Sequence, residues 1–370
     1  MPLTTHTTLI IFMSKTIFGG RMQGFKTIAM YVVTGVALSG CGGGDGDISG
    51  SDSTNYVSSA ALGEVMLFNV DVANLTYDYE VIESRFGCSA VGSVCQNGSG
   101  TLELQPDGTY EPSGSPTTKL FIADNGLLVG GYKLAPDLPA APVLGFSSSS
   151  LVSSFAPMDL LFAGLACETK TETALQSCKT VWGNLVTQDG STFSLCRRGQ
   201  VASCGQSEIF EGDVEYSGRN SVWRLKVDDD VFANMVLTKA EEGAPTIGFI
   251  DFNSPTFGYG NAKISTKVTL TNELVQDNSG TWVLANEAGQ TFLFGLNDSG
   301  ELSTGNTVTL NDPADGFAKI TGDADGPYIS LQTGLGMFSI INNVLGTETY
   351  ASKYFIGVKL SSDPYTSGGS

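Results

Sequence analysis

Carboxylates are the side chains of this sequence that could carry chemistry in an ordered pattern. Glu211, Asp213 and Glu215 occupy alternate positions, and alternate residues of a β-strand project from one face. Three neighbouring carboxylates could bind a cation or raise one another's pKa, and a pair of them performs the chemistry of most glycosidases. The solvent-facing side of any half-buried strand shows the same alternation. We therefore treat the three residues as candidates, with a solvated strand face as the simpler interpretation.

Two further acidic groups stand out. The residues Asp228-Asp229-Asp230 separate two apolar alternating runs, which predicts a hairpin tip. Asp323 and Asp325 share the spacing of a calcium-binding loop. The full EF-hand pattern fails, however, because Thr321 and Gln332 stand where the first Asp and the last Glu are needed. We expect no cofactor, and Ca²⁺ is the one ion that these carboxylates could take.

Histidine is nearly absent from the sequence. The one histidine is His6, which lies in the N-terminal segment, so the body of the protein cannot build Ser-His-Asp or Cys-His nucleophiles or most catalytic zinc sites. The sequence also contains no Gly-x-Ser-x-Gly elbow and no Gly-x-x-x-x-Gly-Lys phosphate loop. These patterns favour a protein without enzymatic activity.

An apolar stretch near the N-terminus ends in a cysteine, with the residues Leu38-Ser39-Gly40-Cys41. An aliphatic residue, two small residues and a cysteine form a lipobox, so this region resembles a bacterial lipoprotein signal peptide. The stretch is shorter than the roughly 20 apolar residues of a membrane-spanning helix. This length favours a cleaved signal over a permanent span.

The resemblance implies a lipid anchor. Cleavage before Cys41 would place that residue first, and acyl chains on it would hold the protein to a membrane. In Gram-negative members of this class an Asp after the cysteine favours the inner membrane, whereas Gly42 follows here. We therefore expect the outer membrane, at its periplasmic face or at the cell surface. Residues 1–40 form the signal region, with Met22 as the expected start, and residues 41–59 form a lipidated, Gly- and Ser-rich tether.

Six cysteines remain when Cys41 is set aside. An even number suits disulfides in an oxidising compartment, although six cysteines allow fifteen connectivities. We predict the three local pairings, because each pair brackets a short stretch that could form a hairpin. The predicted pairs are Cys88 with Cys95, Cys167 with Cys178, and Cys196 with Cys204.

Composition predicts an acidic, all-β body. Charged residues make up only 15% of the chain and glycines number 46, a mixture that suits short strands and tight turns. The net charge is −19, and residues 1–40 contain three basic residues and no acidic one, so the remainder is more acidic still. Nucleic acid is not an expected partner, because its phosphates require a basic stripe.

Alternating apolar residues and regular turn signals predict antiparallel strands. Two loose internal similarities, Val181–Phe193 with Thr281–Phe292 and Ala141–Phe146 with Ala244–Phe249, indicate two or three repeated β modules of sandwich or barrel type. A β-propeller is the alternative. The predicted modules are 60–165, 166–262 and 263–362, followed by a tail at 363–370.

The segment Pro157–Ala166 is the one part of the body with helical features, because a proline is acceptable in the first turn of a helix.

These observations predict a membrane-anchored extracytoplasmic protein with a binding or envelope-structural role. Its expected partners are the membrane, through the lipid, and an envelope protein or a glycan. One alternative is a carboxylate-dependent, glycosidase-like enzyme, favoured by the acidic residues and the three tryptophans. The other alternative is a surface adhesin.

Overall fold

The structure, a computed structural model, describes most of the chain after residue 52. The described stretches are 53–60, 64–84, 97–105, 109–113, 119–122, 127–132, 141–154, 157–170, 175–218, 221–239, 246–267, 280–286, 291–296, 307–321, 328–333, 337–342 and 354–361. Within them the only helical elements are two 3-10 turns, η1 (Ser148–Ser150) and η2 (Val201–Ser203). The predicted all-β class is confirmed.

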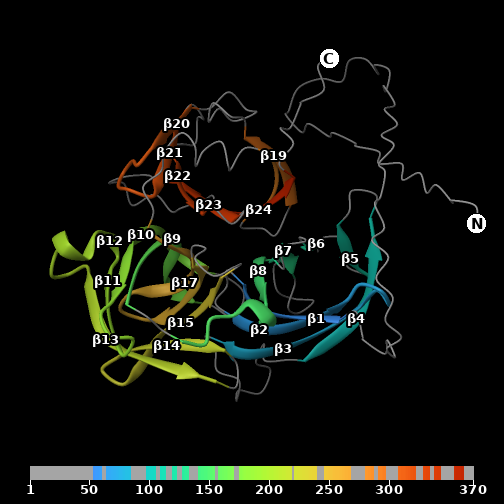
Figure 1. The fold of residues 1–370 in the computed structure, drawn as a ribbon, viewed down its shortest axis with the longest axis horizontal. Helices are drawn as coiled ribbons and strands as arrows, with labels where there is room; N and C mark the ends of the chain where they lie inside the picture. Colours follow the sequence, from blue (N-terminus) through green and yellow to red (C-terminus); the bar gives the residue numbers. More distant parts are fainter. Residues whose placement is uncertain are drawn as a thin grey trace, which may run out of the picture.

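The first eight strands form a closed barrel, called barrel 1 (Figure 1). They are β1 (Ser53–Ala60), β2 (Glu64–Asp71), β3 (Thr76–Ser84), β4 (Gly98–Leu104), β5 (Tyr110–Pro112), β6 (Lys119–Ile122), β7 (Leu127–Tyr132) and β8 (Ala141–Ser147). Each strand pairs antiparallel with the next, and the pairing of β1 with β8 closes the ring. An eight-stranded barrel has an interior that side chains can fill, and Met66, Phe68 and Leu128 are buried there.

A second antiparallel barrel, barrel 2, follows in the chain. Its strands are β9 (Met158–Lys170), β10 (Leu175–Thr187), β11 (Thr192–Cys196), β13 (Ile209–Ser217), β14 (Val222–Val227), β15 (Asp230–Thr238), β16 (Ile247–Ser254) and β17 (Gly258–Thr266). The pairing of β9 with β17 closes this ring, and the short β12 (Arg198–Gly199) adds to β10 in parallel. Contacting aromatic rings fill its interior, among them Phe232, Phe252 and Phe257.

The C-terminal strands form a third antiparallel sheet. They are β18 (Gly280–Asn286), β19 (Thr291–Leu296), β20 (Thr307–Leu310), β21 (Phe317–Thr321), β22 (Tyr328–Thr333), β23 (Met337–Asn342) and β24 (Tyr354–Ser361). Its order is β19-β18-β24-β23-β22-β21-β20. As in the two barrels, the first and last strands in the chain, here β18 and β24, are neighbours. The three units confirm the prediction of repeated antiparallel β modules, and two of them are closed barrels rather than propeller blades.

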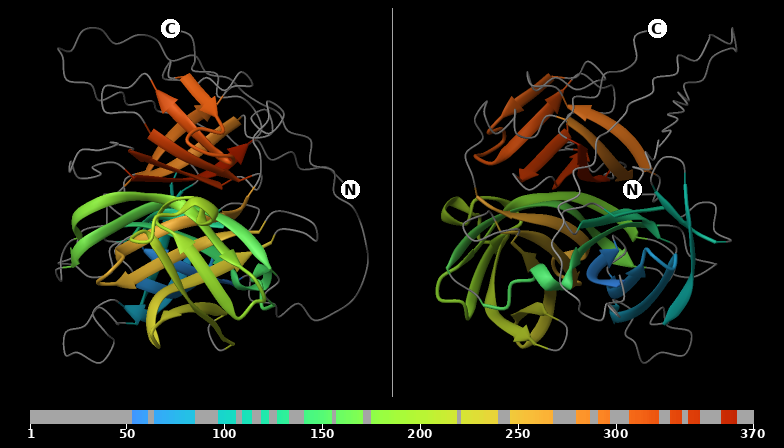
Figure 2. Two further views of the ribbon diagram at one scale, coloured as in Figure 1. Left: turned by 90° about the vertical axis from the view of Figure 1, so that its left-hand side faces the viewer. Right: turned by 45° about the vertical axis from the view of Figure 1, so that its right-hand side comes forward.

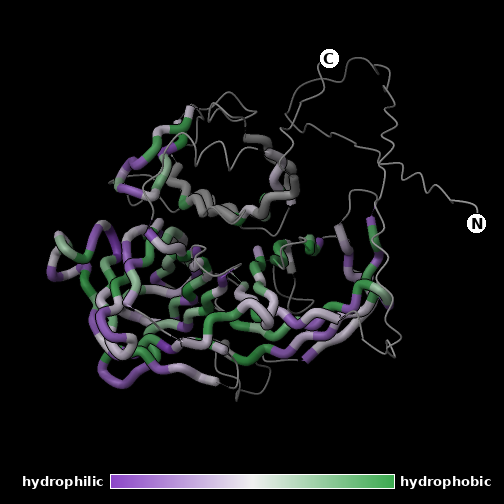
Figure 3. Tube along the Cα trace, in the orientation of Figure 1, coloured by the Kyte–Doolittle hydropathy of each residue, from purple (hydrophilic) through white to green (hydrophobic). Residues whose placement is uncertain are grey.

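One apolar core joins the three units. Figures 1 and 2 show the third sheet lying across both barrels. Phe146 of barrel 1 stacks on Phe249 of barrel 2 with ring centroids 5.8 Å apart, and Trp182 of barrel 2 meets Phe317 of the third sheet edge-on at 5.6 Å. All four side chains belong to, or pack against, a single buried cluster. The outward faces of the barrels therefore carry large apolar side chains where the units meet, whereas Figure 3 shows hydrophilic residues along the outer edge of barrel 2.

The expectation of a helix at Pro157–Ala166 is wrong, because β9 occupies residues 158–170. Leu160 and Phe162 point into barrel 2, and Leu161 and Ala163 point into the core between the units. A strand buried on both faces loses the period-two alternation that identifies half-buried strands. This burial explains why the sequence pattern was misleading.

The predicted module boundaries differ from the observed ones. The strands of the three units span 53–147, 158–266 and 280–361, so the predicted boundary at 165/166 lies inside β9 and that at 262/263 lies inside β17. The predicted tether, 41–59, includes most of β1, in which Val57 and Ser59 are buried. The boundaries of the units are set by strand pairing between residues far apart in the sequence. Local composition gives no indication of that pairing.

The aspartates at the predicted hairpin tip do form a turn. Val227 ends β14 and pairs with Asp230, the first residue of β15. The two residues between them, Asp228 and Asp229, have φ values of 52° and 68°. Positive φ at both central residues is the signature of a type I′ hairpin turn, which confirms the prediction from the sequence.

Candidate functional site

The carboxylate row predicted from the sequence lies on the outside of barrel 2. Glu211, Asp213 and Glu215 alternate along β13 and are exposed to solvent. Glu211 accepts a hydrogen bond from Ser194 Oγ at 3.2 Å, and Glu215 forms an ion pair with Lys226 of the neighbouring strand β14. The row is therefore a hydrogen-bonded, charge-paired outer face.

The electrostatics of this row do not suit acid catalysis. The ammonium of Lys226 hydrogen-bonds to Glu215 and lowers the pKa of that carboxyl, whereas a general acid at neutral pH needs a raised pKa. Within the described stretches, no group of three or more His, Cys, Asp or Glu side chains is placed to hold a metal ion.

Other predicted residues fall outside the described part of the chain. These are Cys41, Cys88, Cys95, Asp323 and Asp325. The signal region 1–40 and the tail 363–370 also lie outside it.

The cysteines within the described part lie at one end of barrel 2. Cys196 and Cys204 form a disulfide, as predicted. Cys167 is also disulfide-bonded, and the antiparallel register of β9 and β10 places Cys178 directly opposite it.

The disulfide joins the last residue of β11 to an exposed loop that connects β11 to β13. We call residues 197–208 the stapled loop. Its ends meet, because the Arg197 amide donates to the Glu208 carbonyl at 2.9 Å. Compact surface loops with adjoining ends are often functional.

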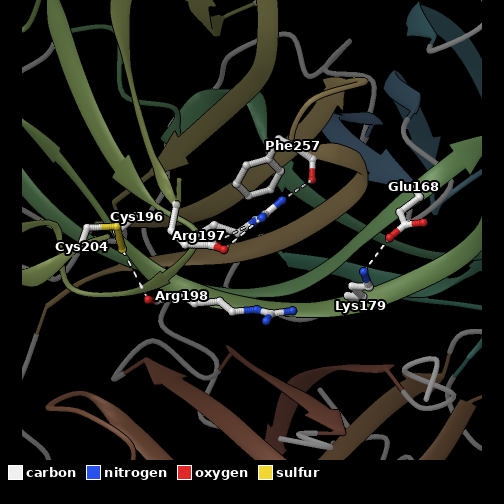
Figure 4. Close-up of polar contacts among 8 residues, drawn as sticks. Glu168, Lys179, Cys196, Arg197, Arg198, Cys204 and Phe257 are labelled. Carbon is white, nitrogen blue, oxygen red and sulfur yellow. Dashed lines mark hydrogen bonds and ion pairs between the residues drawn. A yellow bond between two sulfur atoms is a disulfide. The ribbon is translucent and has the colours of Figure 1, made fainter. Parts of the chain in front are cut away.

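Arg197 fastens the base of the stapled loop. Its Nε and Nη2 donate to the two carboxylate oxygens of Glu208 at 2.8 and 3.2 Å, and its Nη1 donates to the Phe257 carbonyl at 3.5 Å (Figure 4). The guanidinium also lies over the rings of Phe210 and Phe257, 6.0 and 5.8 Å from their centroids. These hydrogen bonds lower the pKa of Glu208. A two-pronged Arg–carboxylate pair is geometrically specific as well as strong.

A second set of contacts fastens the loop to β10. The Val201 amide donates to Asn184 Oδ1 at 2.7 Å, and the amide group of Asn184 donates in turn to Asp159 Oδ1 at 2.7 Å. Gly183 permits the loop to approach, because a Cβ at this position would lie 2.0 Å from the Cys196 carbonyl oxygen. The loop is therefore held by a disulfide, an ion pair and a buried amide.

The outer surface of the stapled loop is exposed and mostly small or polar. Its exposed residues are Arg198, Ala202, Ser203, Gly205, Gln206 and Ser207. The Asp228–Asp229 turn lies at the same end of the barrel, because β13 starts where the loop ends and β14 runs back antiparallel to it. Glu168 and Lys179 form an ion pair of 2.6 Å on the neighbouring β9–β10 hairpin.

Sequence reasoning located the disulfide but not the loop as a site. The available signal was Arg197 directly after Cys196, with Glu208 eleven residues further on. Charged partners at that separation face each other only when the loop closes, so the pairing depends on the fold.

No protein-family model matches the sequence, and no curated protein matches it. Among solved structures, the chain is similar to a double mutant of transferrin binding protein B, a vaccine antigen from Haemophilus parasuis, at 9% identity and a TM-score of 0.21. The match covers 80% of this chain and 65% of that one. The Helicobacter pylori β clamp matches at 8% identity and a TM-score of 0.13, with 86% and 93% covered. At these scores neither likeness bears on function.

The described residues contain no helix of the length and apolarity needed to span a membrane.

Proposed function

We propose that this protein is a lipid-anchored envelope protein that binds a protein partner through the stapled loop of barrel 2. The observation that carries the proposal is an exposed loop whose shape is set before binding. The disulfide, the Arg197–Glu208 pair and the Asn184 contact each hold a different part of it.

Pre-organisation is what a binding loop gains from these contacts. Ordering a flexible loop on association costs free energy that is subtracted from the affinity. The stapled loop is instead ordered when the chain folds, so its ordering does not reduce the affinity for the partner. The exposed side chains of Arg198, Ser203 and Gln206 would supply hydrogen bonds to the partner, around a small apolar contact at Ala202.

The anchor is the second part of the proposal. A lipid on Cys41 would leave eleven residues before Ser53, where β1 begins. Such a Gly- and Ser-rich stretch reaches roughly 18 Å on average, at about 5–6 Å times the square root of its length. The barrels would then stay close to the membrane while remaining free to reorient.

Site-specific photo-crosslinking in cells tests the binding face. A photoreactive amino acid replaces Ala202 or Gln206 in the stapled loop, or Glu80 or Asp213 on exposed strand faces elsewhere as matched controls. We expect light-dependent protein adducts from the two loop positions and none from the controls. The absence of adducts at both loop positions, or adducts of equal yield at all four positions, would rule the loop out as the binding face.

Palmitate labelling tests the anchor independently. Cys41→Ser should abolish labelling and release the protein from the membrane fraction, while the neighbouring Gly42→Ser should change neither. Membrane attachment that survives Cys41→Ser would refute the anchor and leave the crosslinking result standing.

A further inference from the structure

The contact region between barrel 1 and barrel 2, called the joint, contains a row of buried polar side chains. Asn234, Asp251 and Asn261 lie opposite one another on β15, β16 and β17. Their exposed fractions are 3%, 1% and 0%. They share the outward face of barrel 2 with Phe249, because strand positions two residues apart point the same way.

Lys263 lies beside this row, on the same face of β17. It is opposite Phe249, its Nζ is 5.7 Å from the centre of the Phe249 ring, and its side chain is fully buried. Within the described residues, its ammonium nitrogen has no hydrogen-bond partner. Buried ammonium groups are ordinarily paired or hydrogen-bonded, since removing the charge from water is costly.

Both barrels and the third sheet border the region around Lys263. β22 of the third sheet contacts β17, and its sequence contains no Asp, Glu, Lys or Arg. Phe249 stacks on Phe146 of barrel 1, and Asn261 Nδ2 donates to Ser59 Oγ of barrel 1 at 3.1 Å. On the two flanking strands, Val236 of β15 lies opposite Phe249, and Ala163 of β9 lies opposite Lys263.

Asp251 is the charged group whose field acts on Lys263. Burial disfavours the ammonium and Asp251 only partly compensates, so the pKa of Lys263 falls from its ordinary 10.5 to about 7.

We propose that the joint is a pH-responsive latch in which Lys263 is the titrating group and the two barrels are held together when it is neutral. The geometry provides the mechanism, because the amine lies over the Phe249 ring and that ring is covered by Phe146 of barrel 1. Parting the barrels gives Lys263 access to water, which favours its charged form.

The direction follows from proton linkage. The closed joint binds fewer protons than the open one between the two pKa values, about 7 when closed and 10.5 when exposed, so raising the pH favours closure. The open-to-closed ratio should fall tenfold for each pH unit above 7 and should level off below 7, where Lys263 is charged in both states.

Hydroxyl-radical footprinting of the full chain measures the opening directly. The reporters are Phe146 and Phe249, which are buried in the joint, and the controls are Phe162 and Phe252, which contact each other inside barrel 2. We expect oxidation of the joint pair to fall about tenfold per pH unit from 7 to 9, relative to the interior pair. A joint pair that reacts equally at all pH values would overturn the proposal.

Two variants assign the effect to Lys263. Lys263→Met replaces the titrating amine with an apolar side chain, and Lys263→Gln replaces it with a polar one. Each variant should make oxidation of the joint pair independent of pH. Lys226→Met, on the outer face of β14, is the control and should keep the wild-type profile. A pH dependence that persists in a folded Lys263 variant would refute the assignment.

Discussion

Asn261 of barrel 2 hydrogen-bonds through Nδ2 to Ser59 Oγ of barrel 1 at 3.1 Å, and both side chains are fully buried. The two residues are 202 positions apart in the chain. A buried polar contact over this separation ties the stability of one barrel to the other, because removing either side chain breaks this hydrogen bond in a desolvated region.

A double-mutant cycle on this pair measures the coupling. Asn261→Ala and Ser59→Ala should each lower the free energy of unfolding by about 1–3 kcal/mol, while the double variant should lose less than the sum by about 0.5–1.5 kcal/mol. Urea denaturation supplies the four values. Strict additivity would show that the barrels are not coupled through this contact.

Lys263 should make the stability of the whole protein depend on pH. Because its folded pKa, about 7, lies below the ordinary 10.5, its burial destabilises the fold fully below pH 7 and progressively less as the pH rises toward 10.5. Lys263→Met should therefore stabilise the protein most at pH 6–7. The advantage should shrink by at most about 1.4 kcal/mol per pH unit above 7. Urea denaturation of both proteins at pH 6, 7, 8 and 9 gives the difference, and a constant difference would contradict the prediction.

The disulfide of the stapled loop should contribute modestly to stability and strongly to local order. Replacing Cys196 and Cys204 together by Ser should lower the free energy of unfolding by roughly 2.5 kcal/mol, since the bridge closes a short loop. Trypsin should then cut faster after Arg198, whereas cutting after Lys226 within β14 should change little. Equal acceleration at both sites would indicate global loosening instead.

The Asp228–Asp229 turn stores local strain that two substitutions should relieve. Both residues have the positive φ that Asn and Gly adopt with less strain. Asp228→Asn combined with Asp229→Gly should raise the free energy of unfolding by about 1 kcal/mol, measured by urea denaturation. Asp230→Asn removes one charge without touching the turn residues. If this control stabilises the protein equally, charge repulsion rather than backbone strain is the cause.

Some features of this protein follow from local sequence. The exposed alternation of Glu211, Asp213 and Glu215 on β13 is a property of a half-buried strand, in which one face meets water and the other the core. The two-residue turn at Asp228–Asp229 and the disulfide across eight positions at Cys196–Cys204 involve neighbours in the chain. Such features require no knowledge of the rest of the fold.

Other features belong to the tertiary structure alone. The pairing of β1 with β8 and of β9 with β17 closes each barrel through residues about a hundred positions apart. No local pattern records such pairing. Once the third sheet packs on barrel 2, β9 is buried on both faces and its apolar residues no longer alternate with polar ones, which is why it resembled a helix.

Lys263 shows the limit of sequence reasoning most clearly. A lysine between the apolar residues Ala262 and Ile264 indicates the solvent side of a strand, and as far as barrel 2 alone is concerned it does point outward. The outer face becomes interior because other units cover it: Phe249 stacks on Phe146 of barrel 1, and β22 of the third sheet contacts β17. The sequence determined that this chain forms acidic, antiparallel β modules with local staples, because those properties depend on near neighbours. Which outward faces are buried, and which charges are enclosed with them, depends on packing between distant units and was decided only in three dimensions.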